Sequence, residues 1–475
     1  MAALFAAGLW LYYFAALRRK AFRHSALARL LWLLYLFLAV SGTFIAVTDV
    51  LRPVYDPNYW STLFLLLCIL MCISGFAGFR DKDVAQVFQS IRGQKAIENF
   101  LIAAQFIAIA FFIPFALSSL SGDANENRLQ LAAKMEVLGS FGLLNTFCGA
   151  ASQLFSASLV LAFIRLSSRE GRGRHVGRAL VLIFCSLSYV IYILAYVGRD
   201  GVVYWLMTAM MVFLVFRNHL SQPDKRNILA FGALLAGLLL IPFLVITVSR
   251  FFDADLGGSW SLPEYFGAQI HHFSDYSSIE RPLTFGIANF SMFVNAGCSL
   301  AGVECDLWPS VKEFIFDQYL AQGKEPWLFG TFVSDFVADF GFAGTFVLVL
   351  FFSLLCHWVC TGYKPKRQLT LPRLLLVLFL FLVPYWGVFY FRFSIINGYI
   401  IVNLIFILGI ALLQRAAPVK AARGFGASTK SVLLQTTLES RPSQAVRAQA
   451  PEGDLPATPR SRVSRPLRSK RPTTR

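Results

Sequence analysis

Charged residues are scarce in this chain, and so are the motifs with which many enzymes hold nucleotides or metals. Only 15% of the 475 residues are charged, whereas 57% are hydrophobic. This balance excludes an ordinary soluble domain, which carries more charge on its surface. The sequence contains no Walker A loop and no His-Glu-x-x-His motif. We therefore expect no P-loop nucleotide site and no zinc-peptidase site.

Long apolar runs dominate what is present. Most are long enough to cross a hydrocarbon core of about 30 Å, although the first and the seventh are short. Backbone polar groups must be satisfied within each segment in lipid, so the runs are predicted to be helices. The predicted fold is an all-α polytopic integral membrane protein with about eleven transmembrane helices. The runs cover residues 2–17, 27–48, 60–78, 100–121, 138–164, 179–197, 202–216, 228–248, 340–360, 374–391 and 399–414.

Basic residues are distributed unevenly among the segments that connect these runs. Of the 43 lysines and arginines, 34 fall in alternate segments. Because cytoplasmic segments carry the excess of basic residues, the N-terminus is predicted to lie outside and the C-terminus inside. This rule accounts for the net charge of +17, so we expect no nucleic-acid partner. The basic segments are 18–29, 79–99, 165–178, 217–227, 361–373 and 415–475.

Two parts of the chain are not predicted to be membrane helix. Residues 249–339 form a large outer loop between the eighth and ninth helices, within a membrane-embedded domain of residues 1–414. Residues 415–475 form a basic cytoplasmic tail that is poor in large apolar residues and is expected to be disordered. The semi-apolar stretch 284–303 is predicted to be an interfacial or re-entrant helix, since another span would reverse every later loop.

The eight cysteines indicate no metal centre. Six of them fall in or beside predicted helices, where a small apolar thiol packs well. Cys298 and Cys305 both lie in the outer loop and could form a disulfide in an oxidising compartment, or remain free thiols. The remaining cysteines lack zinc-ligand spacing and histidine partners, so we expect no metal and no other cofactor.

Four arginines stand out on the predicted outer face, where basic residues are rare. Arg199 lies in the short turn Gly198-Arg199-Asp200-Gly201 between two apolar runs, and Arg250 and Arg392 follow the ends of other predicted helices. Arg281 lies in the outer loop. Each could extend to lipid headgroups, or the four could form an anion clamp, because a guanidinium binds phosphate in a bidentate manner. The anion expected at this leaflet is a lipid-linked pyrophosphate.

Candidate general bases also lie on the outer face. His271 and His272 are adjacent in the outer loop, with Asp275 nearby, and a histidine can accept a proton near neutral pH. Two adjacent histidines can also mark an ordinary polar loop. Asp49 and Asp56 in the first outer loop are the competing candidates.

Two stretches resemble one known family. The segment from Tyr189 to Arg217, with its Gly198-Arg199-Asp200-Gly201 turn, resembles the bacterial oligosaccharide repeat-unit polymerases of O-antigen and capsule pathways (Wzy-type). So does the stretch from Phe329-Gly330-Thr331 to Asp339-Phe340-Gly341-Phe342-Ala343-Gly344-Thr345. The resemblance spans residues 180–414.

This resemblance implies a metal-independent glycosyltransferase on the outer face of the bacterial inner membrane. Its donor would be a glycan on undecaprenyl pyrophosphate, and its acceptor a hydroxyl of a second lipid-linked repeat unit. Arg199 corresponds to the arginine of the short-turn motif and would hold the pyrophosphate. Asp200 is expected to take part in catalysis or to orient Arg199.

The sequence leaves other functions open. A ligase that transfers the finished glycan to another acceptor needs a similar site. A glycosyltransferase that uses a lipid-phosphosugar is another alternative, with Asp49 or Asp56 as its catalytic carboxylate. A transporter of polysaccharide or lipid would need charged residues along a central path, and the ionisable residues here cluster at helix ends and in loops. The expected partners are a polyprenyl-pyrophosphate-linked oligosaccharide and membrane lipids. A chain-length regulator could also bind.

Overall fold

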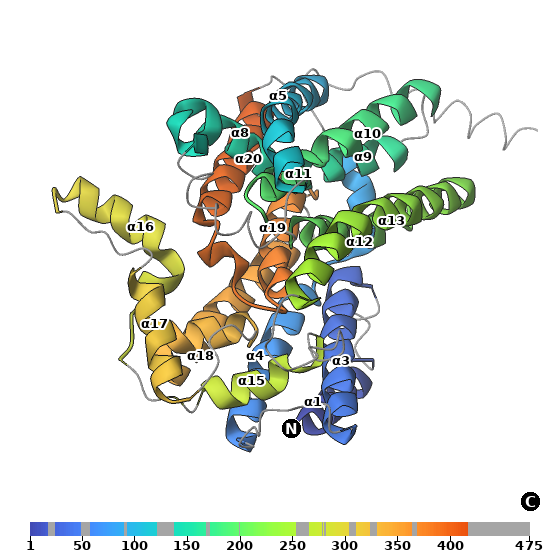
Figure 1. Ribbon diagram of the computed structural model, residues 1–475. Coiled ribbons are helices and arrows are strands. Elements are labelled where there is room, and N and C mark those ends of the chain that lie inside the picture. Colours follow the sequence, from blue (N-terminus) through green and yellow to red (C-terminus); the bar gives the residue numbers. More distant parts are fainter. Residues whose placement is uncertain are drawn as a thin grey trace, which may run out of the picture. The chain divides into compact units, whose positions relative to one another are not determined.

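The computed structural model is all-helical over the residues that it describes (Figure 1). These are residues 1–17, 24–48, 58–89, 93–120, 137–167, 172–198, 200–252, 266–277, 279, 282–303, 310–323, 330–362 and 368–416. By its contacts the chain divides into two units, Met1–Ala417 and Pro418–Arg475. The sequence predicts that the basic tail is disordered. The second unit, which contains most of that tail, lies outside the described residues.

The N-terminal part of the chain builds pairs of neighbouring helices. Within these pairs α1 packs on α3, α5 on α11, and α9 on α10. The elements are α1 (Ala2–Leu17), α3 (Ala26–Val47), α4 (Tyr59–Phe76), the 3-10 helix η1 (Asp81–Gln89), α5 (Gln94–Leu120), α8 (Leu143–Gln153), α9 (Phe155–Ser167), α10 (Arg172–Ser186), α11 (Ser188–Ala195) and α12 (Asp200–Phe216).

The C-terminal part adds long helices and the helices of the outer loop. The long helix α18 returns to the N-terminal part and packs along α4. The elements are α13 (Gln222–Phe252), α15 (Gln269–Tyr276), α16 (Ile287–Leu300), α17 (Ser310–Ala321), α18 (Phe332–Thr361), α19 (Leu371–Trp386), the 3-10 helix η2 (Arg392–Ser394) and α20 (Asn397–Ala416).

The prediction of a polytopic helical membrane protein is confirmed at that level. Six described helices are long and apolar enough to cross a membrane, and the bent pair α8 and α9 makes a seventh if it forms one span. Every predicted apolar run overlaps a helix. Four apolar helices, α1, α12, α16 and α19, are shorter. Eleven spans and the N-out, C-in orientation therefore stay predictions.

The segment between α13 and α18 is shorter than the outer loop predicted for residues 249–339. Helix α13 continues to Phe252, and α18 begins at Phe332 with a break at Gly341, whose φ is 66°. Hydropathy marks only the apolar part of a helix, so polar turns at its end are missed. Helix α16, at 14 residues, is about 21 Å long and too short to span alone, as predicted for this stretch.

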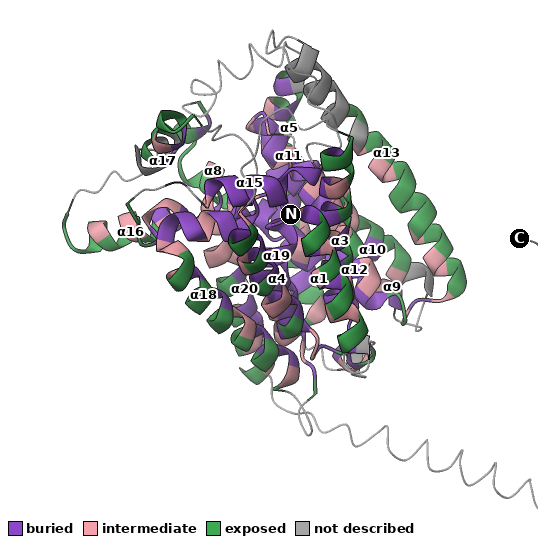
Figure 2. Ribbon diagram, turned by 90° about the horizontal axis from the view of Figure 1, so that it is seen from below, coloured by how far each residue is buried: buried purple, intermediate pink, exposed green. Residues whose placement is uncertain are grey.

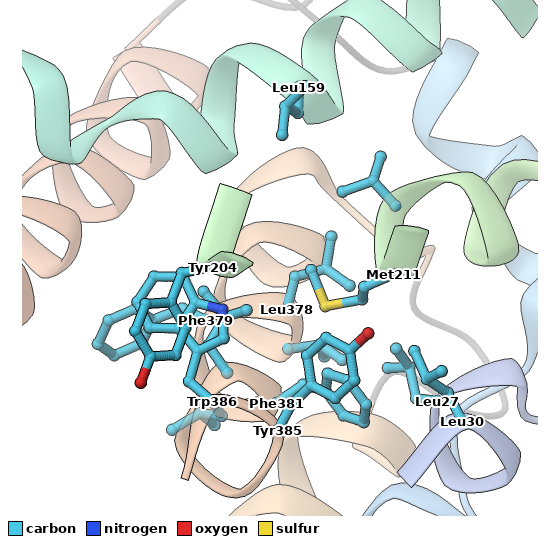
Figure 3. Packing of buried hydrophobic residues seen from close by; sticks show 14 of the residues in the cluster. Leu27, Leu30, Leu159, Tyr204, Met211, Leu378, Phe379, Phe381, Tyr385 and Trp386 are labelled. Carbon is cyan, nitrogen blue, oxygen red and sulfur yellow. The ribbon is translucent and has the colours of Figure 1, made fainter. Parts of the chain in front are cut away.

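Aromatic rings form the core where α9, α11, α12 and α19 meet (Figure 3). Trp386, at the end of α19, stacks on Phe155 and Tyr189 with ring centroids 6.0 and 6.3 Å away. Its Nε1 donates to Thr208 Oγ1 of α12 over 3.2 Å. The buried residues concentrate between the helices, and the exposed faces of α18 and α20 carry apolar side chains suited to lipid (Figure 2). This packing fixes the end of α19, from which the 387–397 segment departs.

Polar contacts keep the predicted inner segments together. Arg29 pairs with Asp81, and Asp81 O accepts from His219 Nε2 over 2.9 Å. Leu369 N donates to Gln86 Oε1 over 2.9 Å. All five residues belong to segments with an excess of basic residues. These segments therefore gather at one end of the bundle.

The predicted outer segments likewise contact one another. Asn58 N donates to Ser274 Oγ over 2.9 Å, which joins the first outer segment to the outer loop. Phe391 N donates to Asp335 Oδ2, which joins the α19–α20 connection to the start of α18. The contacts sort the loops into the same two groups that the charge count does.

A buried ionic cluster holds together the ends of three helices that are predicted to lie on the inner side. Glu98 of α5 is fully buried, and Arg165 of α9 donates to its two oxygens over 2.7 and 3.1 Å. Arg178 of α10 also pairs with Glu98. A carboxylate buried this deeply needs such partners, because an unpaired charge costs several kcal/mol.

We predict that Glu98→Gln lowers the free energy of unfolding by about 3 kcal/mol or more, because it leaves two arginines without their counter-charge. Thermal and denaturant unfolding of the protein in nanodiscs measures the loss. Asp317→Asn, at an exposed carboxylate of α17, is the matched control and should change little. If the double variant Glu98→Gln/Arg165→Gln loses the sum of the single losses, the pair is not coupled.

Candidate functional site

The turn between α11 and α12 is tightly built. Val197 has a φ of 57°, and Gly198 N donates to Ile193 O over 2.9 Å. A Cβ at Gly198 would lie 2.6 Å from Ile193 Cγ2, and one at Gly201 would lie 2.7 Å from Ile193 Cβ. The glycines are therefore required by close packing on Ile193. Asp200 follows as the first residue of α12.

Arg392 lies against this turn. It starts η2 in the connection between α19 and α20, and only 5% of it is exposed. Its Nη1 is 2.5 Å from Asp200 Oδ2 and donates to the hydroxyl oxygen of Tyr390 over 2.7 Å. The Tyr390 hydroxyl donates to Asp200 Oδ2 over 3.2 Å. Arginine, tyrosine and carboxylate thus form a closed triangle.

Aromatic rings surround the guanidinium on its buried side. Its carbon lies 5.1 Å from the ring centroid of Tyr204, one turn after Asp200 in α12, in a cation–π geometry. The charge of Arg392 also interacts with the hydroxyls of Tyr189 and Tyr192 of α11. Its Nε has no hydrogen-bond partner among the described residues. This donor is buried with the rest of the guanidinium, so only a group inside the site could satisfy it.

Exposure differs between the two charged partners. The side chain of Arg392 is 6% exposed, whereas that of Asp200 is 32% exposed. A solute that reaches this site from water therefore meets Asp200 before Arg392. An anion that binds Arg392 must share it with Asp200 or displace that carboxylate.

Strained backbone collects around the same site. Three described residues other than glycine have a positive φ: Val197, Phe285 and Thr331. Val197 precedes the turn, and Thr331 N donates to Phe389 O over 2.9 Å, three residues before Arg392. Such conformations cost about 1–3 kcal/mol each and often occur at functional sites. Their position supports a functional role for this end of the bundle.

The two histidines lie in α15, which packs on α3 and α4. The ring Nε2 of His271 is 3.2 Å from Gly42 O, and the ring of His272 stacks on Tyr276 at 6.0 Å. Burial lowers the pKa of His271 and lowers the pKa of His272 to about 3. A ring with so low a pKa is neutral but accepts a proton poorly.

One aromatic contact links α15 to the arginine site. Phe266, just before α15, lies 5.9 Å from Phe389 between ring centroids. The structure thus joins Asp200 and Arg392 directly, whereas His271 and His272 belong to the packing of α15 on α3. Their catalytic role stays a prediction.

Several predicted site residues lie outside the described residues. These are Arg199, Arg281, Cys305 and the competing bases Asp49 and Asp56. Arg250 belongs to α13, but its side chain is not described. Cys298 is disulfide-bonded, and the other six described cysteines are buried thiols. The pairing of Cys298 with Cys305 stays a prediction.

Sequence reasoning missed the tyrosines of the site. Tyr204 lies four residues after Asp200 on one face of α12, and Tyr390 lies two residues before Arg392. The four-residue spacing between Asp200 and Tyr204 could have indicated that the two side chains are neighbours, since residues four apart on a helix lie on the same face. The second lies in a connection, where no regular period places a side chain.

The described residues hold no metal cluster, and a small cavity lies between four of the helices. No group of three or more His, Cys, Asp or Glu side chains among them is placed to hold a metal ion. Helices α9, α12, α19 and α20 enclose a cavity of about 10 Å³, with Ser156 and Asn403 among its lining. That is room for one water at most.

Comparisons of the chain with models of protein families, with curated proteins and with solved structures found no match. The geometry of the site is therefore the basis for the chemistry proposed for it.

Protonation of the buried histidines should destabilise the fold in acid. Both native pKa values are lowered, so below the unfolded value of about 6.5 the unfolded chain binds more protons than the folded one. The free energy of unfolding should fall as the pH drops from about 7 to 5. For His272 the slope approaches about 1.4 kcal/mol per pH unit.

Unfolding of the protein in nanodiscs at several pH values measures this slope. The variant His272→Gln should show a shallower slope than the wild type. His24→Gln, at an exposed histidine, should keep the wild-type slope. Equal slopes for the wild type and His272→Gln would contradict the prediction.

Proposed function

We propose that this protein polymerises lipid-linked oligosaccharide repeat units at the outer face of the bacterial inner membrane, as a metal-independent glycosyltransferase. The observation that carries the proposal is the Arg392–Asp200 pair beside the short turn that also contains Arg199. It unites a cation suited to pyrophosphate with a carboxylate that water can reach.

The sorting of the loops supports the proposed orientation. Contacts place the arginine-poor segments together, and the Arg392 site belongs to that group. With the basic segments in the cytoplasm, the site faces outward. The donor would be a glycan on undecaprenyl pyrophosphate, and the acceptor a second lipid-linked unit.

Each residue of the proposed site has one task. Arg199 and Arg392 hold the pyrophosphate and balance the charge that develops as it leaves. Asp200 accepts the proton of the acceptor hydroxyl. The hydroxyl oxygen then bonds to the anomeric carbon of the donor, the bond from that carbon to the pyrophosphate oxygen breaks, and its electron pair leaves with undecaprenyl pyrophosphate.

The location of buried charge favours this proposal over a transporter. Glu98 is the fifth residue of α5 and pairs with Arg165 in the last turn of α9, so the buried ion pair lies near helix ends. The Asp200–Arg392 pair also joins a helix start to a connection. A transport path would instead need such groups near mid-membrane. A ligase would use the same site. The products that cells make with the Arg392→Lys variant distinguish a ligase from a polymerase.

We predict that Arg392→Lys reduces the yield of long polysaccharide about 100-fold at normal protein level. Lysine keeps the charge beside Asp200 but loses the planar fork that binds pyrophosphate. Gel analysis of the glycan made by cells measures chain length. Arg415→Lys, at the exposed end of α20, is the matched control.

The outcomes separate the candidate functions. Unchanged chain length with Arg392→Lys would contradict the proposed role of Arg392. Long chains that are made but no longer transferred to a final acceptor would indicate a ligase instead.

A second prediction concerns the short turn. Arg199→Ala, at unchanged protein level, should leave cells with single repeat units, because the pyrophosphate loses a charge partner. Composition analysis of the lipid-linked glycans measures the repeat number. Chain length equal to the wild type would remove Arg199 from the site.

A further inference from the structure

A second buried carboxylate holds the start of α16. Asp339 of α18 is fully buried. It accepts from Thr284 Oγ1, from Asn289 N over 3.0 Å and from Asn289 Nδ2 over 2.6 Å. Ala288 N adds a longer contact of 3.3 Å. Asp339 thus satisfies the free N–H groups at the first turn of α16, where a negative charge is favoured.

The backbone around Asp339 is shaped for this contact. Phe285 and Gly286 both have positive φ values, 50° and 95°, and Phe285 N donates to Asp339 O over 2.9 Å. On the other side α18 breaks at Gly341. Phe285 therefore holds an unfavourable conformation, and Gly286 and Gly341 supply positive φ values that suit glycine, where α16 docks on α18.

The same network reaches the segment that carries Arg392. Asn289 Nδ2, besides bonding Asp339, donates to Asp335 O over 2.9 Å. The Asp335 carboxylate accepts from Phe391 N over 2.5 Å. Phe391 is the residue before Arg392, so two steps join the first turn of α16 to the arginine.

A second tie runs in parallel. Asn397, at the start of α20, donates from Nδ2 to Asn289 O over 3.1 Å and accepts at Oδ1 from Met292 N over 3.3 Å. The ring of Phe391 contacts Phe290 of α16 at 5.5 Å and Phe336 of α18 at 4.8 Å. The 391–397 segment is thus held by α16 on one side and α18 on the other.

We propose that Asp339, Asn289 and Asp335 are positioning residues for Arg392, which lies correctly only while α16 is docked on Asp339. A simple helix cap would need Asp339 alone, whereas here one amide also engages Asp335, whose carboxylate holds the N–H beside Arg392. Displacement of a site residue by about 1 Å can cost about 100-fold in rate. The inference rests on the proposed function only in giving Arg392 an anion to bind.

Hydrogen–deuterium exchange of the full chain in nanodiscs tests this coupling without an activity assay. Asp339→Asn keeps the size of the side chain but turns an NH₂ group toward the donors of α16. We expect exchange to rise about tenfold both in residues 284–290 and in residues 389–396. Asp317→Asn in α17 is the matched control and should leave both segments unchanged.

A rise confined to 284–290 would overturn the proposal, since Asp339 would then cap α16 and nothing more. If Asp339→Asn fails to fold, Asn289→Ala decides in its place. It removes the amide shared by Asp339 and Asp335 but leaves the Thr284 contact. Faster exchange at 389–396 in this variant supports the proposal, and wild-type exchange there contradicts it.

Chain-length analysis of Arg392→Lys, beside the exchange measurements on Asp339→Asn and Asn289→Ala, keeps the two proposals apart. Coupled exchange with normal polysaccharide in Arg392→Lys would retain the positioning network and reject the proposed function. Uncoupled exchange with short chains in Arg392→Lys would do the reverse.

Discussion

The burial of one guanidinium constrains the end of the helix bundle at which Asp200 and Arg392 meet. Removing an isolated charge from water costs several kcal/mol, and a cation–π contact such as that with Tyr204 returns only about 0.5–2 kcal/mol. The carboxylate of Asp200 must supply most of the rest. Because Arg392 and Asp200 come from different hairpins, α11–α12 and α19–α20 are held in a single arrangement. The tight turn at Gly198 and the core around Trp386 both serve that arrangement.

The two ends of the bundle use charge in different ways. At the end predicted to be cytoplasmic, Glu98 satisfies two arginines and little of the cluster is left for a ligand. At the opposite end Arg392 keeps one unpartnered donor and Asp200 keeps contact with water. The first arrangement is suited to holding helices together. The second is suited to chemistry, and for this reason we place the proposed reaction there.

Much of this architecture could be predicted from local patterns. Apolar runs located the helices, because a membrane span depends on a stretch of neighbouring residues. The scarcity of outward arginines singled out Arg392, and the short turn singled out Asp200. Their contact could not be predicted, since Arg392 and Asp200 lie far apart in the sequence and no local period relates them. The burial of His271 and His272 was missed for the same reason, because it depends on α15 packing against α3 and α4.

The long separation between Asp200 and Arg392 also has a consequence for biogenesis. The chain is synthesised from its N-terminus, so α12 is made well before the connection after α19. During that interval the carboxylate of Asp200 and the rings of Tyr204 and Tyr189 lack the Arg392 guanidinium. The site closes only when the last two helices arrive. A nascent protein that stalls or is cleaved before that point is inserted in the membrane yet chemically unfinished, with an incomplete end that proteases for misassembled membrane proteins can recognise.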